Sequence, residues 1–209
     1  LLSKFGGMAR QLVIAGAFGI SASYDAYNYA YIIPGFFLVL LGGINGPLHN
    51  SMVTLLAEKN KIESRLFINS VNNILALILL LISFIVFFSS DLLINLVGAN
   101  LSAEVKEIAS SQLKIMSPII LISGLIGIGF GSLNAKKEFL IPSLSPLISS
   151  LIIIISIINF WINKENNNEL YQLDIRGGII LAKATFIGAL SQYLIQIPFL
   201  IKKGIFAIS

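Results

Sequence analysis

The sequence predicts an all-α protein that crosses a membrane several times, with about six transmembrane helices. Of its 209 residues, 56% are hydrophobic and only 11% are charged, and the mean hydropathy is +0.89. A soluble domain carries about 25% charged residues. The apolar residues also fall into separate runs, each close to or longer than the roughly 20 residues that a helix needs to cross the bilayer core. We expect helices at about residues 1–18, 26–57, 66–88, 112–134, 140–161 and 179–201.

The first run carries two cations, Lys4 and Arg10, among apolar and small residues. On an ideal helix they are about 120° apart around the axis and about 9 Å apart along it. A charge at membrane depth is costly and usually faces a bundle interior or a water-filled cavity. The pattern therefore favours a cavity-facing role for Arg10. For Lys4 it leaves open a second position, with the ammonium group extended to the membrane surface.

The second run is longer than a membrane requires and is interrupted. Asp25 precedes it and is expected to cap the helix, because a carboxylate can accept hydrogen bonds from the free N–H groups of a first turn. Pro34 lies inside the run, and proline kinks a helix. Such breaks occur in membranes where neighbouring groups or cavity water satisfy the backbone. Asn45 adds a polar group, for which ordinary helix–helix hydrogen bonding is an equally good explanation.

The later runs are more regular. Residues 66–88 form the most lipid-like run, whereas a polar connection precedes residues 112–134, with Ser102 placed as a helix N-cap. Four glycines between 124 and 131 favour a close packing face, with a hinge as the alternative. Two prolines near the start of residues 140–161 fall where a helix tolerates them.

The loop charges predict an orientation. If the first run begins in the cytoplasm, seven cations fall on the cytoplasmic side and three on the external side, which is a positive-inside pattern. The cytoplasmic set is Lys59, Lys61, Arg65, Lys136, Lys137, Lys202 and Lys203, and the external set is Lys106, Lys164 and Arg176.

The composition argues against several classes of function. The net charge of +4 is explained by the basic loops, so it does not indicate a nucleic-acid partner. There is no cysteine, and the one histidine, His49, cannot form a metal site by itself. No phosphate-binding loop, nucleophile elbow or zinc-protease motif is present. We therefore expect a protein that is not an enzyme and that holds no metal or cofactor.

Several short motifs, in their order and spacing, resemble one family. Residues 3–10 read Ser-Lys-Phe-Gly-Gly-Met-Ala-Arg, and Phe-Gly, Asp-Ala-Tyr and Ile-Pro follow at 18–19, 25–27 and 33–34. Residues 133–137 read Leu-Asn-Ala-Lys-Lys, ahead of a Ser-Pro pair. This pattern resembles the MurJ (MviN) lipid II flippases of the multidrug/oligosaccharidyl-lipid/polysaccharide exporter superfamily, across essentially the whole chain.

The resemblance implies a fourteen-helix transporter of two lobes in the bacterial cytoplasmic membrane, with residues 1–209 as the N-terminal transmembrane lobe. The lobes would rock about a central cationic cavity to flip lipid II, the undecaprenyl-pyrophosphate-linked peptidoglycan precursor. Arg10 and Lys4 match positions that would meet the pyrophosphate. Ser3, Asp25, Pro34 and Asn45 are assigned to the cavity or to gating. The chain departs from the family pattern at Gln11 and at residues 36–43, which lack the further arginine and glutamate that are often found in helix 2.

Two alternatives remain at this point. One is a polysaccharide or drug exporter of the same superfamily, and the other is a truncated membrane remnant that transports nothing. The chain begins at Leu1 without an initiator methionine. We therefore expect the N-terminus to be cut off within the first helix, and the resemblance implies that the chain is a fragment whose C-terminal lobe is absent.

Overall fold

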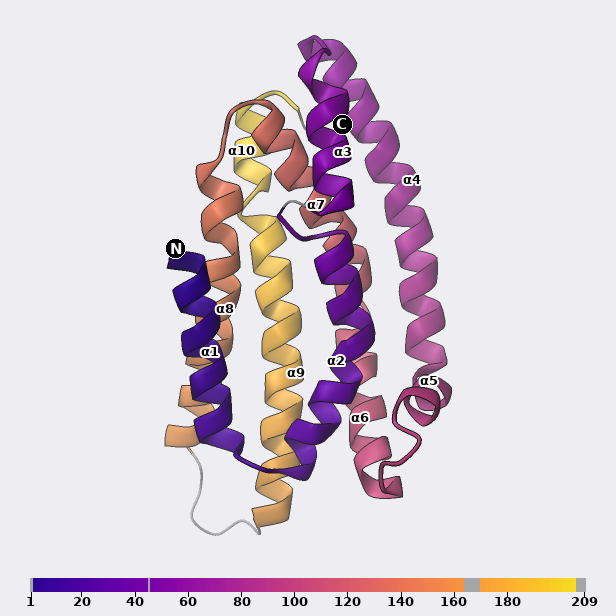
Figure 1. Ribbon diagram of the computed structural model, residues 1–209, viewed down its shortest axis with the longest axis vertical. Helices are drawn as coiled ribbons and strands as arrows, with labels where there is room; N and C mark the ends of the chain where they lie inside the picture. The colour runs from indigo at the N-terminus through magenta and orange to yellow at the C-terminus, as the bar shows by residue number, and fades with distance from the viewer. Residues whose placement is uncertain (1, 45, 164–169, 206–209) are drawn as a thin grey trace.

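The computed structural model describes residues 2–44, 46–163 and 170–205, and the regular secondary structure in these ranges is helical (Figure 1). The helices are α1 (Leu2–Phe18), α2 (Ala22–Leu40), α3 (Pro47–Ala57), α4 (Lys61–Phe88), α5 (Ser90–Val97), α6 (Ala103–Met116), α7 (Ile119–Ala135), α8 (Leu140–Ile162), α9 (Leu170–Leu194) and α10 (Ile197–Lys202).

The long helices run up and down the long axis of one bundle (Figure 1). The turns after α3 and α7 lie at one end, and the α1–α2 turn and the short helix α5 lie at the other. The main packing pairs are α8 with α9, α1 with α8, α2 with α6, and α3 with α7. Elements far apart in the sequence therefore come together around a common interior.

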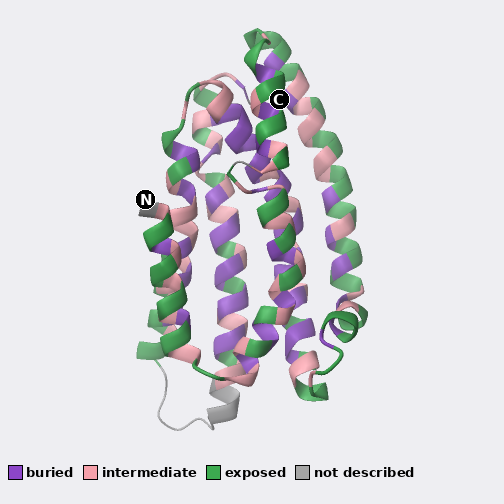
Figure 2. Cartoon of the chain, in the orientation of Figure 1, coloured by how far each residue is buried: buried purple, intermediate pink, exposed green. Residues whose placement is uncertain are grey.

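The core lies along α7. Its side chains Ile119, Ile120, Ile126, Phe130 and Leu133 have no exposed surface. By contrast, α4 presents apolar side chains outward along most of its length, and Figure 2 shows this helix largely in the exposed and intermediate colours. An apolar surface on the outside of the bundle fits contact with lipid, as the composition of the 66–88 run predicts.

The lengths of the helices support a membrane bundle. In the described residues, α4, α8 and the segment Asp174–Lys202 are each long and apolar enough to cross a membrane, and the bent pair α6–α7 is a fourth candidate. The helices α1 and α2 have 17 and 19 residues and lie alongside these segments in the same bundle (Figure 1). They carry the charged and tyrosine-rich stretches, which makes them less apolar than the other four.

The predicted helix over residues 26–57 is divided in the structure. The helix α2 ends at Leu40, and α3 begins at Pro47 with Gly46 as its N-cap. Proline at the first position of a helix loses no needed hydrogen bond and has a suitable φ. Pro34, in contrast, lies buried within α2. The break therefore occurs at the glycine-rich segment 41–46 and not at the first proline.

The expectation that Asp25 caps α2 was wrong. Ser21 is the N-cap, and its side chain accepts a hydrogen bond from the Tyr24 backbone N–H at 3.2 Å. Asp25 lies one turn further in, exposed. A second carboxylate, that of Asp174 on α9, accepts a hydrogen bond from the Ser23 backbone N–H at 3.0 Å. The start of α2 is thus held by a local hydroxyl and by a distant acid that the sequence pattern did not indicate.

Two further predicted helices are also divided. The 112–134 run contains the end of α6 and the whole of α7 up to Asn134, with a bend of 40° at Ser117 and Pro118. The 179–201 run falls into α9 and α10, which meet at residues 195–196. Ser102 caps α6 as predicted, accepting a hydrogen bond from the Val105 backbone N–H at 3.3 Å.

The glycines of α7 form a packing face, as the first of the two interpretations predicted. A Cβ on Gly127 would collide with the backbone oxygen of Leu41 in the α2–α3 break. A Cβ on Gly131 would lie 2.8 Å from the backbone oxygen of His49 in α3. These two glycines, one turn apart, let α7 approach the break and α3 at backbone distance. The same interface contains a 2.7 Å hydrogen bond between Asn134 Nδ2 and His49 Nε2.

Candidate functional site

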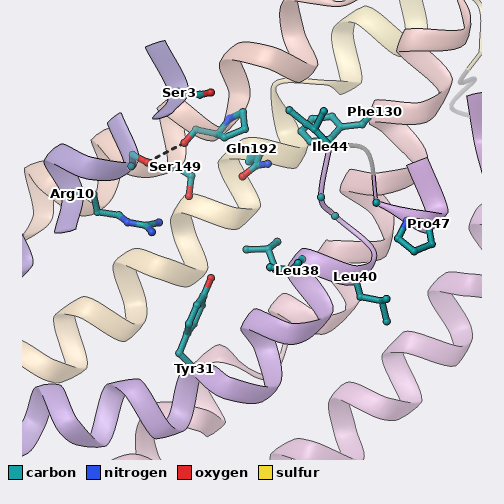
Figure 3. A pocket seen from close by; sticks show the side chains of 17 residues that line it. Ser3, Arg10, Tyr31, Leu38, Leu40, Ile44, Pro47, Phe130, Ser149 and Gln192 are labelled. Carbon is teal, nitrogen blue, oxygen red and sulfur yellow. Dashed lines mark hydrogen bonds between the residues drawn. The ribbon is translucent and has the colours of Figure 1, made fainter. Parts of the chain in front are cut away.

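A cavity of about 640 Å³ opens where α1, α2, the α2–α3 break, α7, α8 and α9 meet (Figure 3). This volume is within the range of roughly 300–1,000 Å³ that is usual for ligand sites. Most of the lining is apolar side chain or glycine backbone. The polar side chains that line it are those of Ser3, Arg10, Tyr31, Ser149, Ser150 and Gln192.

Arg10 supplies the positive charge of this cavity. The helix α1 packs against α8, where Gly6 lies close to the side chains of Leu147 and Ser150. From one turn further along α1, the half-buried Arg10 side chain extends into the open space (Figure 3). None of the described lining residues is acidic, and no described carboxylate forms an ion pair with Arg10. The guanidinium group therefore faces the cavity without an internal counter-ion in the described part of the chain.

Tyr31 reaches the cavity from α2, with its hydroxyl directed into the space (Figure 3). Its ring stacks on that of Tyr27, with centroids 5.7 Å apart and planes 10° apart. Tyr27 is itself buried, and its hydroxyl is hydrogen-bonded to Thr185 Oγ1 of α9 at 2.9 Å. The ring of Tyr31 therefore packs against Tyr27, whose own position is fixed by a hydrogen bond to α9.

Gln192 reaches the same space from α9. It is 7% exposed, and its backbone oxygen accepts a hydrogen bond from the side-chain amide of Gln196 at 2.9 Å. Its own side-chain amide forms no hydrogen bond with another described residue. The cavity is thus lined by an uncharged amide that can both donate and accept hydrogen bonds.

The structure brings together some of the predicted site residues but not all. Ser3 and Arg10 line the cavity. Lys4 is exposed and is not among the lining residues, and neither are the exposed Asp25 and the buried Pro34. Asn45 lies outside the described residues.

Four polar lining residues were not predicted from the sequence, namely Tyr31, Ser149, Ser150 and Gln192. A signal for Tyr31 exists, because residues 24, 27 and 31 are all tyrosines at helical spacing and so share one face of α2. Gln192 is an uncharged polar residue inside an apolar run, which is a weaker signal. Nothing local distinguishes Ser149 from the other serines of α8.

A second polar cluster lies at the opposite end of the bundle, between α5 and α6. The Asp91 carboxylate accepts a hydrogen bond from the Ser110 hydroxyl and forms an ion pair with Lys114 at 3.2 Å. The hydrogen bond from Ser110, together with Lys114, holds the pKa of Asp91 below its ordinary value. This cluster ties α5 to α6 and does not contribute to the cavity.

The fold and the cavity together define a multi-pass α-helical membrane protein whose bundle is hollowed around a cationic side chain that has no ion-pair partner among the described residues. No group of three potential metal ligands occurs among the described residues. Residues 14–208 match the family model described as "Lipid II flippase MurJ". The chain belongs to this family.

Individual relatives agree with the family match. The chain is 41% identical over 199 residues to the probable lipid II flippase MurJ of Synechocystis, covering 94% of this chain and 37% of that protein. It is 37% identical to the lipid II flippase MurJ of Thermosipho africanus, over 73% of this chain and 32% of that protein. A solved structure titled "Lipid II flippase MurJ, inward closed conformation" superposes with a TM-score of 0.78 at 32% identity, over 96% of this chain and 40% of the other. The chain therefore spans less than half the length of these relatives.

Proposed function

We propose that this chain forms the N-terminal lobe of a lipid II flippase and works with a C-terminal lobe, in a bacterial cytoplasmic membrane. The proposal is carried by one observation: Arg10 projects into a large cavity that has no acidic lining residue in the described part of the chain. The relatives named as lipid II flippases support lipid II as the substrate, and favour it over another glycan lipid or a drug.

The chemistry of the substrate fits this wall of the cavity. A lipid-linked pyrophosphate carries negative charge that must be balanced as its headgroup leaves water. A guanidinium group pairs with phosphate oxygens through two parallel hydrogen bonds. Arg10 would hold the pyrophosphate while the lobes alternate between the two sides of the membrane. The activity is then transport by rearrangement of helices, with no bond made or broken in the substrate.

The other predicted residues have secondary parts in this proposal. Lys4 is on the same helix as Arg10 but outside the lining, so we assign it to attraction of the headgroup near the cavity mouth. Ser3 lines the cavity and offers a hydroxyl. Asp25 and Pro34 lie on α2 but outside the lining, so we assign them to the movement of α2 and not to contact with the substrate. Asn45 is retained as a cavity or gating residue on the sequence pattern.

The orientation follows from the loops. The end of the bundle that holds the turns after α3 and α7 (Figure 1) also carries all seven cations of the predicted cytoplasmic set, since Lys203 at the end of α10 pairs with Glu138 in the turn after α7. We propose that this end faces the cytoplasm, since basic loops are retained there. They are Lys59, Lys61, Arg65, Lys136, Lys137, Lys202 and Lys203.

The test replaces Arg10 in the full-length parent protein. Cells depleted of their own flippase are complemented with the wild type, with Arg10→Ala or with Arg65→Ala, which removes an exposed arginine outside the cavity. We expect growth and lipid II translocation with the wild type and the control, and their loss with Arg10→Ala at equal membrane levels. Normal translocation by Arg10→Ala would overturn the proposed role.

A further inference from the structure

We infer that Tyr31 and Gln192 form a binding subsite for the uncharged sugar part of the headgroup, next to a phosphate subsite at Arg10. This inference rests on the proposed function, because it assigns parts of one ligand to parts of the same cavity. It concerns two residues for which neither the family match nor the names of the relatives provide a role.

The polar lining of the cavity has two chemically different parts. Arg10 is the one cation among the described lining residues, and it projects from α1. The polar groups that come from α2 and α9 are an uncharged phenol and an uncharged amide. Uncharged groups of this kind give little selectivity for an anionic ligand. They do form hydrogen bonds with hydroxyl and acetamido groups, which are the polar groups of amino sugars. The wall therefore changes from a cationic part to a neutral hydrogen-bonding part.

Tyr31 has a fixed position in the cavity wall. One face of its ring is covered by Tyr27, which is tied to Thr185 of α9. That face cannot stack on a ligand, so Tyr31 presents its hydroxyl and ring edge to the cavity (Figure 3). Because the ring is already held in place, little conformational freedom is lost when its hydroxyl binds a ligand.

Gln192 contributes its side-chain amide to the same cavity. A side-chain amide that is 7% exposed and makes no hydrogen bond to other described residues is available to bind whatever enters the cavity. It lies on a different helix from Tyr31, and both side chains point toward the same space (Figure 3). Two neutral groups from α2 and α9 can therefore contact different polar groups of one sugar unit.

The experiment measures the affinity of the purified full-length parent protein in detergent for two lipids. Lipid II carries both the pyrophosphate and the sugars, whereas undecaprenyl pyrophosphate carries the pyrophosphate alone. The variants are Tyr31→Phe, which keeps the stacked ring, Gln192→Met, which keeps the length of the side chain, and Arg10→Gln. Tyr29→Phe on α2 and Gln11→Met on α1 are matched controls, because neither residue lines the cavity.

We expect Tyr31→Phe and Gln192→Met each to weaken lipid II binding by about two- to tenfold, as loss of a neutral hydrogen bond does. Binding of undecaprenyl pyrophosphate should not change. Arg10→Gln should weaken binding of both lipids by about tenfold or more. The inference is overturned if the two neutral substitutions leave lipid II affinity within the range of the controls, or if they weaken both lipids equally. A wild-type protein that binds neither lipid would instead refute the proposed function itself, so the two failures are distinguishable.

Discussion

Replacing Gly131 with alanine tests how tightly α3 packs on α7. An added Cβ would lie 2.5 Å from the Cβ of Met52 and 2.8 Å from the backbone oxygen of His49. Neither neighbour can rotate away, because one atom is attached directly to the backbone and the other is part of it. Contacting carbon atoms lie about 3.5–4.0 Å apart, so α3 must move by roughly 1 Å relative to α7.

The size of the effect follows from two opposing terms. Overpacking of this kind costs about 1–3 kcal/mol. Replacing a helical glycine by alanine gains about 1 kcal/mol in helix propensity. The matched control is Gly16→Ala on α1, where an added Cβ would meet no atom within 4 Å. The Gly16→Ala control keeps the gain in helix propensity and has no overpacking cost. Gly131→Ala should therefore be less stable than Gly16→Ala by about 1–3 kcal/mol.

The measurement is thermal unfolding of the purified full-length parent protein and both variants in the same detergent. We expect a lower midpoint for Gly131→Ala than for Gly16→Ala, with Gly127→Ala also lower, since its Cβ would collide with the Leu41 backbone oxygen. Equal midpoints for Gly131→Ala and Gly16→Ala would refute the close approach of α3 to α7. The α2–α3 break would then have to be held by something other than the glycine face.

Two other predictions concern hydrogen bonds that join helices. Asp91→Asn should lower stability at neutral pH, and the difference in stability from wild type should shrink as the pH falls below about 4. The reason is that a carboxyl group whose pKa is lowered by folding stabilises the fold above its ordinary pKa. It loses this effect as it becomes protonated at lower pH. A difference that stays constant down to pH 3 would contradict the ion pair with Lys114. Tyr27→Phe removes the hydrogen bond to Thr185 and should cost about 1 kcal/mol in thermal unfolding relative to Tyr29→Phe. Equal stability of these two variants would mean that the bond contributes nothing.

The sequence was most informative where a helix is uniform. The 140–161 run appears as Leu140–Ile162, because its apolar composition alone predicts such a helix. The 1–18 run appears as Leu2–Phe18 although it carries two cations. The sequence was least informative about breaks. Pro34 and Pro47 both disfavour a continuous helix, yet only Pro47 begins a new one. The glycines before Pro47, and the α7 backbone that packs against them, determine that the helix breaks there and not at Pro34. The packing of α7 is a tertiary contact, which the local sequence does not reveal.

The candidate site was predictable only in part for a similar reason. Arg10 stood out because a charge in an apolar run needs an explanation. The contacts that organise the surroundings join residues separated by long stretches of chain. Lys114 pairs with Asp91, and Tyr27 bonds to Thr185. No local pattern predicts which distant residue will be a partner, so the sequence indicated the charge but not the neutral part of the cavity.

Neither α2 nor the glycine-rich segment after it supplies a second cation to the cavity beside Arg10, and the packing of this region gives a reason. Residues 38–40, 42 and 43 line the cavity with apolar side chains and glycine backbone. A Cβ on Gly42 would already lie 3.0 Å from the Leu38 oxygen and 3.1 Å from the Ser123 oxygen, so a long side chain does not fit there without rearrangement. Among the described lining residues, Arg10 is therefore the one cation that faces the cavity. Under the proposed function, any further cation that neutralises a pyrophosphate would come from a region that matches the rest of the relatives' length, since the relatives are more than twice as long as this chain.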